Sequence, residues 1–404
     1  MKILLLCNRL PFPASDGGSI AISNMAYSLI AQGHQIKILA FNTSKHHIQQ
    51  NQLPKEVIEN FNPTTVDLDN SVKMMGALKC LISGKSYHVE RFISTAFQNK
   101  LQEILQAENF DIIQLESLYL APYVPVIRKY SSATLVMRAH NAEFKIWERL
   151  AETTPFGPKK WYLKILARQL KTFELKNLSA YDGIVSITPE DKAFFLSYGC
   201  KTPIHITPIG VNPDEYPLSP APQKNQTLRL FHLGSMDWMP NLEAMQWFLE
   251  KVWPQIFQSF PSIHLYMAGK NMPEWIKQKE NERLHIIGEV KDAKAFMAEN
   301  DIMIVPLLSG SGMRVKIIEG MAMGKPIIST SIGAEGIEYT KDENILIADT
   351  AEEFLLSIQK CMQNPDLMQS LGENAHALVS EKYNNTLLAH KLNEFYEDLR
   401  SQKR

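Results

Sequence analysis

Residues 306–336 bring together the residue types that bind a phosphorylated ligand. Two cations and one acid, Arg314, Lys316 and Glu319, follow a loop of small residues, Gly310-Ser311-Gly312-Met313. Small residues let successive backbone N–H groups turn toward one point, and the N-terminus of a following helix adds the positive end of its dipole. Cations in the first turn of a helix oppose that dipole, so we expect an anion beside them. A diphosphate fits this requirement.

Two apolar strands position the loop. Ile302–Val305 precedes it, a helix of about ten residues follows it, and Gly324-Lys325-Pro326 ends that helix before the strand Ile327–Thr330. Taken alone, the loop is equally typical of an ordinary strand–helix–strand unit with a Gly-rich turn and solvated charges. The clustered cations, and Glu319 within reach of hydroxyl groups on the same ligand, favour a binding site.

The same stretch resembles the donor-site motif of the retaining nucleotide-sugar glycosyltransferases of the GT-B fold, the group called family four. That motif has two Glu residues separated by seven others, and the second lies in a K-I-x-E-x-M-A-x-G-x-P run. Residues 316–326 match the run, and Glu319 matches its Glu. The first Glu falls on Ser311, which is a departure. The loop instead resembles a sub-branch in which a Gly/Ser-rich loop precedes R-x-K.

The composition indicates an ordinary globular protein of two domains. The chain has 404 residues, which is long for one domain. Its formal net charge of −1 gives no electrostatic argument for nucleic-acid binding. The four cysteines lie far apart, without zinc-ligand or CxxC spacing, so we interpret them as reduced thiols of a cytoplasmic protein. No run approaches the roughly 18 apolar residues that span a bilayer, so any membrane contact is expected to be peripheral.

Short apolar runs alternate with amphipathic segments along the whole chain. This alternation is typical of strand–helix–strand units and predicts an α/β protein with two Rossmann-like, doubly wound parallel sheets. The predicted strands are Ile3–Cys7, Ile36–Ala40, Thr65–Leu68, Ile112–Leu115, Thr134–Met137, Ile184–Ile187, Leu228–Leu233, His264–Met267, Leu284–Ile287, Ile302–Val305 and Ile327–Thr330. Predicted helices include Ile20–Ala31, Leu118–Lys129 and Asn241–Phe260.

A Pro-rich polar segment, 208–227, divides the chain and is typical of a linker or hinge. We therefore predict an N-terminal domain over 1–207 and a C-terminal domain over 228–383. Residues 384–404 have helical period with one apolar face. In proteins of the GT-B fold the last helix crosses back to the first domain, and the resemblance implies the same here.

Gly17 and Gly18 lie in the turn after the first strand. The carboxyl ends of parallel strands face the ligand crevice, so this turn is expected to border it. The turn is not G-x-G-x-x-G, so we predict no dinucleotide site. A glycine loop that touches a sugar or phosphate and a tight strand-to-helix turn both stay open. The turn also resembles the N-terminal glycine loop of the same transferase family.

His140 lies in a polar run, 138–143, directly after the strand Thr134–Met137. Imidazole titrates near neutral pH, so His140 can donate or accept a hydrogen bond near a reacting centre. The alternative is structural, with Asn141 capping a helix and the backbone satisfying the histidine. Members of the family carry a histidine at this strand end that contacts the donor sugar, and the resemblance implies that role for His140.

Gly234 and Ser235 follow the strand Leu228–Leu233, where their backbone N–H groups can approach donor phosphates. Members of the family often place an Arg and a Lys beyond this glycine to hold the diphosphate. Neither stands there in this chain, and we expect Arg314 and Lys316 to replace them.

Gly288 and Val290 end the strand Leu284–Ile287 on the same edge of the predicted sheet. The resemblance implies that backbone groups here meet the nucleobase of the donor. A plain strand-to-helix turn is the alternative.

Asp67-Leu68-Asp69 matches the D-x-D metal motif of the other large glycosyltransferase fold. A match of three residues arises easily by chance, and this one lies far along the chain from the cation-rich loop. Because Arg314 and Lys316 can neutralise a diphosphate leaving group, we predict neither a metal nor another cofactor.

Residues 159–176 form a predicted helix that is rich in Lys and Arg and has an apolar face. A basic amphipathic helix can lie on an anionic membrane. More often, such a helix packs on a core and leaves its basic face in water.

These features predict two doubly wound α/β domains, and the resemblance implies a GT-B protein with its site in the cleft between two facing domains. The resemblance implies transfer of a sugar, with retention, from a nucleotide diphosphate sugar to a glycan, lipid-linked or small-molecule acceptor, in cell-surface polysaccharide or glycoconjugate biosynthesis. It would act in the cytoplasm, or peripherally at the inner face of the plasma membrane. Arg314 and Lys316 would stabilise the diphosphate, Glu319 would fix the ribose, and His140 would orient the sugar. A nucleotide-sugar epimerase-like enzyme and a non-catalytic nucleotide-sugar-binding protein are the alternatives.

Overall fold

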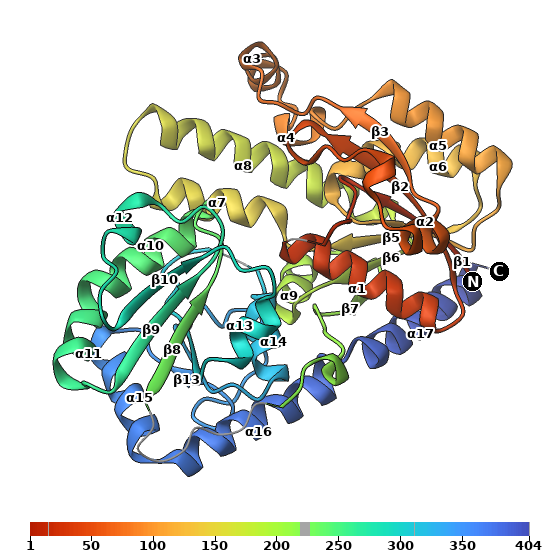
Figure 1. The fold of residues 1–404 in the computed structure, drawn as a ribbon. Helices are drawn as coiled ribbons and strands as arrows, with labels where there is room; N and C mark the ends of the chain where they lie inside the picture. Colours follow the sequence, from red (N-terminus) through yellow and green to blue (C-terminus); the bar gives the residue numbers. More distant parts are fainter. Residues whose placement is uncertain (15, 219–226, 311, 404) are drawn as a thin grey trace. The chain divides into compact units, whose positions relative to one another are not determined.

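The structure is a computed structural model that describes residues 1–14, 16–218, 227–310 and 312–403 (Figure 1). It divides into two compact units, of which the first comprises Met1–Pro208 with Asn385–Arg404 and the second comprises Ile209–Asn384. The predicted linker covers residues 208–227. Its described residues from Ile209 onward belong to the second unit and do not form a separate segment. There the Val211 N–H donates to the carbonyl of Tyr383 at 2.9 Å.

The described residues of the first unit form a parallel seven-stranded sheet with the order β3-β2-β1-β4-β5-β6-β7. Its strands are β1 (Lys2–Cys7), β2 (Gln35–Thr43), β3 (Thr64–Leu68), β4 (Ile112–Leu115), β5 (Thr134–Ala139), β6 (Gly183–Ser186) and β7 (Ile204–Ile206). Apolar residues occupy both faces of β1 because it is a central strand, with Ile3 opposite Ile36 on one side and Ile112 on the other. The six strands predicted here are confirmed. β7 is missing from the prediction because three residues give no recognisable pattern.

Helices and short helical turns connect these strands. They are α1 (Gly17–Ala31), η1 (Ser44–His46), η2 (Gln50–Gln52), α2 (Lys55–Phe61), α3 (Met74–Ser83), α4 (Tyr87–Glu90), α5 (Thr95–Ala107), η3 (Leu118–Tyr123), α6 (Val124–Tyr130), α7 (Glu143–Thr153), α8 (Pro158–Asn177), η4 (Leu178–Ala180) and α9 (Pro189–Ser197). α1 begins where it does because the Asp16 carboxylate accepts hydrogen bonds from the N–H groups of Gly18 and Ser19 at 3.1 and 3.2 Å.

The C-terminal helix α17 (Asn385–Lys403) completes the first unit. It lies beside α1 (Figure 1), and Leu388, Leu392 and Tyr396 on its apolar face join the core under β1 and β2. α17 and the first strand β1 therefore contribute to the same hydrophobic core.

The described residues of the second unit form a parallel six-stranded sheet with the order β10-β9-β8-β11-β12-β13. Its strands are β8 (Leu228–Leu233), β9 (Ile263–Ala268), β10 (Leu284–Gly288), β11 (Ile302–Val305), β12 (Ile327–Ser329) and β13 (Leu346–Ile347). The five strands predicted in this half are confirmed. The helical segments are η5 (Pro213–Glu215), α10 (Met239–Trp247), η6 (Phe248–Val252), α11 (Trp253–Ser259), α12 (Glu274–Lys277), α13 (Ala293–Ala298), α14 (Val315–Ala322), α15 (Ala351–Gln363) and α16 (Pro365–Lys382).

The predicted helix Asn241–Phe260 differs in detail from the structure. It begins earlier, at Met239, because Pro240 is tolerated in the first turn of a helix. It also contains a π-helical turn, Phe248–Val252, between α10 and α11. Hydrophobic periodicity does not distinguish such a turn from a continuous helix.

Each sheet reverses its strand order once, and this is the place where open parallel sheets bind ligands. In the first unit the reversal lies between β1 and β4, and in the second between β8 and β11. The loops at the carboxyl ends of these strands are therefore the places to look for function. Among the described residues, no helix is both long enough and apolar enough to cross a membrane.

Candidate functional site

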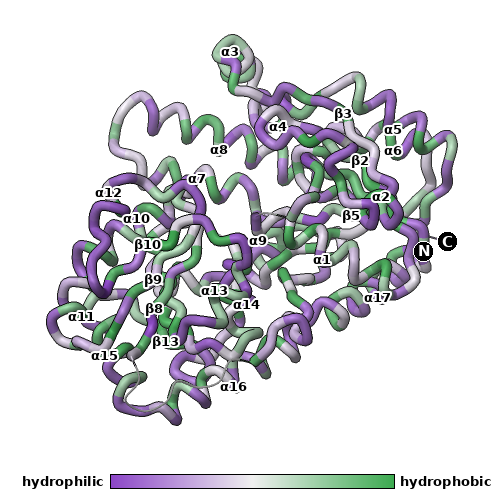
Figure 2. The backbone as a smooth tube through the Cα atoms, in the orientation of Figure 1, coloured by the Kyte–Doolittle hydropathy of each residue, from purple (hydrophilic) through white to green (hydrophobic). Residues whose placement is uncertain are grey.

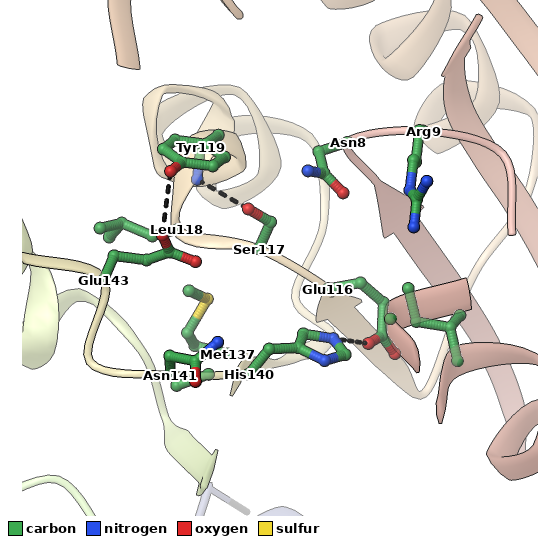
Figure 3. Close-up of a pocket in the computed structure, with 13 residues that line it drawn as sticks. Asn8, Arg9, Glu116, Ser117, Leu118, Tyr119, Met137, His140, Asn141 and Glu143 are labelled. Carbon is green, nitrogen blue, oxygen red and sulfur yellow. Dashed lines mark hydrogen bonds and ion pairs between the residues drawn. The ribbon is translucent and has the colours of Figure 1, made fainter. Parts of the chain in front are cut away.

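A pocket of about 130 Å³ lies at the strand-order reversal of the first unit (Figure 3). Three strand ends contribute to its lining. Asn8 and Arg9 follow β1, and residues 116–119 follow β4. Residues 139–141, at and after the end of β5, and Glu143, the first residue of α7, complete this part of the lining. Gly18 from the start of α1 also lines it. The lining combines apolar surface with side chains that can donate or accept hydrogen bonds, and this combination is typical of small-molecule pockets.

His140 contacts a buried carboxylate in this pocket. Its Nε2 lies 3.1 Å from Oε2 of Glu116, and Figure 3 shows the ring directed at that carboxylate. Nη1 of Arg138 lies 3.5 Å from the same oxygen, and the side chains of Arg138 and Glu116 are each 1% exposed. The purely structural interpretation of residues 138–143, in which Asn141 caps a helix and the backbone satisfies His140, does not agree with the structure. α7 is capped at Ala142 rather than Asn141, and a side chain satisfies His140.

The charge of Glu116 is stabilised by its neighbours. Burial alone would raise its pKa, but the charge of Arg138 and the hydrogen bonds from His140 and Gln114 outweigh burial and lower the pKa. The Gln114 amide donates to Oε1 of Glu116 at 2.6 Å, and its oxygen accepts from the hydroxyl of Tyr396 in α17. An ionised carboxylate only accepts, so Nε2 of His140 must carry the proton of this bond.

A second set of carboxylates lies at the start of α7. The two oxygens of Glu174 accept hydrogen bonds from the N–H groups of Glu143 and Phe144, each at 3.1 Å. Burial first, and then the charge of Glu143, raises the pKa of Glu174 to about 8. The hydroxyl of Tyr119 donates to Glu143 at 2.9 Å (Figure 3). Burial, with a contribution from Asp191, raises the pKa of Glu143 against the effect of that bond.

The two N-terminal glycines differ in position. Gly18 lines the pocket, whereas Gly17 is the first residue of α1 and is not among the lining residues. Asp16, which caps the helix, is ion-paired with Arg9. The turn therefore serves both as a capped start of α1 and as one wall of the pocket.

The cation-rich loop of the second unit follows β11. The guanidinium of Arg314 lies over the ring of Trp238, 5.1 Å from its centroid, and Nη1 donates to the carbonyl of Gly312. Gly310 has a φ of +110°, and a Cβ there would lie 2.9 Å from Nη2 of Arg314. The positive φ favours glycine at this position, because other residues rarely adopt that backbone conformation. Ser311 lies outside the described residues.

Helix α14 begins immediately after Arg314, which is its N-cap residue. It has eight residues rather than the predicted ten or so, because Gly324 at φ +66° follows its end. Arg314 and Lys316 thus lie at the positive end of the helix dipole, as predicted. Met313, also predicted as a donor contact, is buried at 8% exposure.

Glu319 is 7% exposed and held by two partners. The hydroxyl of Tyr216 donates to Oε1 at 3.1 Å, and Nζ of Lys316 lies 2.8 Å from Oε2. Tyr216 lies in the segment predicted to be a linker, so the sequence gives no sign of this contact. Lys316 and Glu319 are one turn apart, which is the spacing at which helical side chains pair.

Gly234 does not offer the N–H group expected of it. Its N–H donates to the carbonyl of Ala268 at 3.0 Å, so it is engaged in the sheet. A Cβ on Gly269 would lie 1.7 Å from the carbonyl oxygen of Gly234. The absence of a side chain at Gly269 therefore allows its backbone to contact the backbone of Gly234. The side chain of Ser235 donates to Asp237, and its carbonyl accepts from Asn241 at 2.9 Å. The N–H of Gly234 is thus engaged in the sheet and not available for the predicted phosphate contact. The predicted contact of Ser235 through its N–H stays a prediction.

Gly288 ends β10, with φ at +73° and open space where a Cβ would stand. Its carbonyl accepts from the N–H of Gly269 at 2.7 Å. Val290, two residues on, is half-buried. Gly234, Gly269 and Gly288 therefore form one row of backbone contacts at the carboxyl edge of β8, β9 and β10. Gly269, the middle member, is absent from the prediction because it has no motif around it.

The two aspartates of the D-x-D sequence contact neighbouring protein side chains. The Asp67 carboxylate accepts from Asn42 at 2.9 Å, and Asp69 is ion-paired with Lys73 at 3.0 Å. Within the described part of the chain, no three His, Cys, Asp or Glu side chains are grouped so as to hold a metal ion.

Two family models match the chain. Glycosyltransferase Family 4 matches residues 15–215, and Glycosyl transferases group 1 matches residues 227–364. The fold agrees with them, since sucrose-phosphate synthase from Thermosynechococcus elongatus superposes with a TM-score of 0.69 over 100% of both chains, at 15% identity. The chain belongs to the GT-B glycosyltransferases.

Two other proteins are similar to this GT-B glycosyltransferase over nearly its whole length. An uncharacterised 44.6 kDa protein in the cps region of Klebsiella pneumoniae is 24% identical over 95% of this chain and 96% of its own. The Anabaena protein HepE, solved in complex with UDP-glucose, superposes with a TM-score of 0.65 over 98% of this chain and 100% of its own, at 14% identity.

The sequence prediction missed Glu116, Tyr216 and Gly269, which hold predicted site residues of this glycosyltransferase in place. Glu116 had a usable signal, since a carboxylate directly after the apolar strand β4 falls at the ligand-binding edge of the sheet. Tyr216 and Gly269 had none, because their partners lie far away in sequence.

Proposed function

We propose that this protein transfers a sugar from a nucleotide diphosphate sugar to an acceptor hydroxyl, with retention of the anomeric configuration. The observation that carries the proposal is the placement of Arg314 and Lys316 at the N-terminal end of α14, at the strand-order reversal of the second unit. Membership of the GT-B glycosyltransferases supports the reaction class, and the family resemblance supports retention.

The second unit binds the nucleotide end of the donor in this proposal. When the bond between the anomeric carbon and the diphosphate breaks, negative charge develops on the departing oxygen. Arg314, Lys316 and the N–H groups of the loop before α14 stabilise that charge. Trp238 and the Gly312 carbonyl hold the guanidinium before the donor arrives, so little reorganisation is needed. With two cations available, the step proceeds without a divalent metal.

Glu319 and His140 contact the two sugars of the donor. A carboxylate accepts hydrogen bonds from hydroxyl groups, so Glu319, oriented by Tyr216, binds the ribose. His140, fixed through Nε2 by Glu116, contacts the transferred sugar from the pocket of the first unit. Gly288 and Val290 contact the base through their backbone.

The acceptor is a glycan, a lipid-linked sugar or a small molecule, and the process is the synthesis of a cell-surface polysaccharide or glycoconjugate. The Anabaena structure with UDP-glucose supports uridine nucleotides as the first donors to test. The Klebsiella relative in the cps region supports glycans as the first acceptors.

The test is a turnover assay with UDP-, GDP- and ADP-sugars, with and without a pool of glycan and lipid-linked acceptors. We expect acceptor-dependent release of nucleoside diphosphate, unchanged by EDTA, and a product whose anomeric configuration in NMR matches that of the donor. Formation of an epimeric nucleotide sugar without acceptor would contradict the proposal. So would tight donor binding without turnover on any acceptor in the pool.

A further inference from the structure

Helix α3 carries its large apolar side chains on the outside of the first unit. Met74, Met75, Leu78 and Ile82 are 87%, 81%, 53% and 80% exposed. At 100° per residue, these four positions fall on one arc of the helix. Figure 2 shows the hydrophobic colour of α3, and Figure 1 shows the helix at the periphery of its unit, beyond α4. An ordinary surface helix turns such an arc toward the core.

The inward side of α3 is built from small residues. Gly76, Ala77 and Cys80 face the unit, and a Cβ on Gly76 would lie only 3.0 Å from the ring of Tyr87. The Cys80 carbonyl accepts from Gln169 of α8 at 3.1 Å. The helix is therefore docked firmly by its small face, and the outward direction of the apolar arc is fixed by packing.

A second exposed apolar group lies where α7 turns into α8. Phe156 in the turn is fully exposed, and Trp161 in the first turns of α8 is 62% exposed. The same part of α8 packs against α3, since Leu163 and Leu166 share a cluster with Cys80. α3 and the α7–α8 turn are thus neighbouring elements of one unit.

Both segments are basic and lack acids. Residues 70–86 contain Lys73, Lys79 and Lys85 without an acidic residue, and residues 155–173 contain Lys159, Lys160, Lys164, Arg168 and Lys171 without one. Among the described residues, Lys79, Lys159, Lys164 and Arg168 form no ion pair. Exposed apolar side chains and unneutralised cations thus occur on the same two elements.

We propose that α3 and the α7–α8 turn form a docking surface for an anionic lipid bilayer. Met75, Ile82, Phe156 and Trp161 would enter the interface between headgroups and acyl chains, while the lysines contact anionic headgroups. Aromatic rings and long cationic side chains are the groups that anchor proteins at this depth.

The charge distribution favours a bilayer over a second copy of the chain. A two-fold contact through this surface would bring the same lysines of both copies together, and like charges would repel. An anionic bilayer instead complements the lysines and accepts the apolar arc without needing a shaped partner. The helix 159–176, considered from sequence alone as a membrane helix, contributes only its first turns, and α3 contributes the larger apolar group.

Docking there would hold one end of α7 at the membrane. The other end of α7 begins at Glu143 in the pocket, so the same rigid helix connects the docking surface to the pocket. The inference itself does not rest on the proposed function, because it concerns adsorption of the protein without donor or acceptor.

The test is co-sedimentation of the full chain with vesicles of phosphatidylcholine, with and without about 30 mol% phosphatidylglycerol. We expect binding that requires the anionic lipid and falls strongly between about 0.1 and 0.5 M NaCl. Met75→Ser with Ile82→Ser should weaken binding about ten-fold or more, because two apolar anchors are lost. Lys79→Glu with Lys159→Glu should weaken it similarly at low salt.

Leu356→Ser is the matched control, since Leu356 is 57% exposed on α15 in the other unit and should not affect binding. All substituted residues are exposed, and an unchanged thermal unfolding midpoint verifies folding. Absence of binding to anionic vesicles would overturn the inference, as would equal loss in the Leu356→Ser control. Concentration-dependent self-association that disappears in Met75→Ser with Ile82→Ser, without vesicle binding, would assign the surface to a dimer instead.

Discussion

At the scale of single residues, Glu116 determines what His140 can do. It is buried, its pKa is lowered against the effect of burial by Arg138 and His140, and so it stays ionised and accepts a hydrogen bond from Nε2–H of His140. The other ring nitrogen, Nδ1, is left for a ligand. The ring thus has a fixed orientation before any ligand binds, which is the condition for a positioned hydrogen bond to a sugar hydroxyl.

Replacing His140 separates the roles of the two units. His140→Ala should lower the rate of transfer by about a hundred-fold, since one positioned hydrogen bond to the transferred sugar is lost. Affinity for free nucleoside diphosphate, measured by calorimetry, should not change, because its proposed contacts all lie in the second unit. His390→Ala, an exposed position on α17, is the control. An unchanged rate, or an equal loss of diphosphate affinity, would refute the assignment.

At the scale of elements, two acidic side chains from other helices accept hydrogen bonds from the backbone N–H groups at the start of α7. Glu174 of α8 accepts from the first N–H groups of α7, and Asp191 of α9 accepts from Ala142 at 3.1 Å. Acceptors at a helix N-terminus satisfy unpaired donors and favour the helix dipole. These contacts fix the direction in which the chain leaves β5, and with it the position of His140 and Glu143.

The acids at α7 should make stability depend on pH. The pKa of Glu174 is about 8 in the folded protein against 4.5 for an ordinary Glu, so between these values the folded state binds more protons than the unfolded state. Stability of the first unit should therefore fall as pH rises from about 5 to about 8.5, by up to about 4 kcal/mol from this group. Glu174→Gln should flatten that slope in calorimetric scans.

Glu103→Gln removes an exposed acid of the same unit that is ion-paired with Lys100, and it should leave the slope unchanged. A slope in Glu174→Gln as steep as in the wild type would contradict the raised pKa. A rise of stability with pH over the same range would contradict its direction.

The strands and their ends were predictable from sequence because buried parallel strands are short apolar runs, and the polar residues directly after them fall at one edge of the sheet. His140 and Arg314 were found in this way. The partners that fix them were not, since Glu116 meets His140 only when β4 and β5 pair, and Tyr216 meets Glu319 across 103 positions. The sequence also could not show that the N–H of Gly234 is engaged, because its acceptor, the carbonyl of Ala268, lies on another strand.

At the scale of the whole molecule, two units of the same design share one chain. Each has a parallel sheet with one reversal of strand order, and each places its candidate residues at the carboxyl ends of its strands. The first unit is completed only by α17, whose Tyr396 joins the hydrogen-bond chain through Gln114 to Glu116. The end of the chain thus supports both the core of this unit and its pocket.

Substitutions on the buried and the exposed face of α17 test whether the stability of the first unit depends on the packing of this helix. Leu392 is fully buried, and Leu387 on the same helix is 45% exposed. Leu392→Ala should lower the free energy of unfolding of the first unit by about 2–4 kcal/mol, and Leu387→Ala by less than about 0.5 kcal/mol. Calorimetry, with the transition of the second unit identified by its shift with nucleoside diphosphate, measures both. Equal effects of the two substitutions would contradict the packing of α17.

The most direct test of the central claim is a thermal-shift panel of UDP, GDP, ADP and their sugar conjugates on the wild type, Arg314→Ala and Lys316→Ala. A ligand that binds only the folded state raises the unfolding midpoint. The account predicts a rise with one nucleoside family, and about ten- to hundred-fold weaker binding in each variant because a charged contact is lost. Lys360→Ala, an exposed lysine on α15, should bind like the wild type. Unchanged affinity in both Arg314→Ala and Lys316→Ala, or no rise with any nucleotide, would contradict the account.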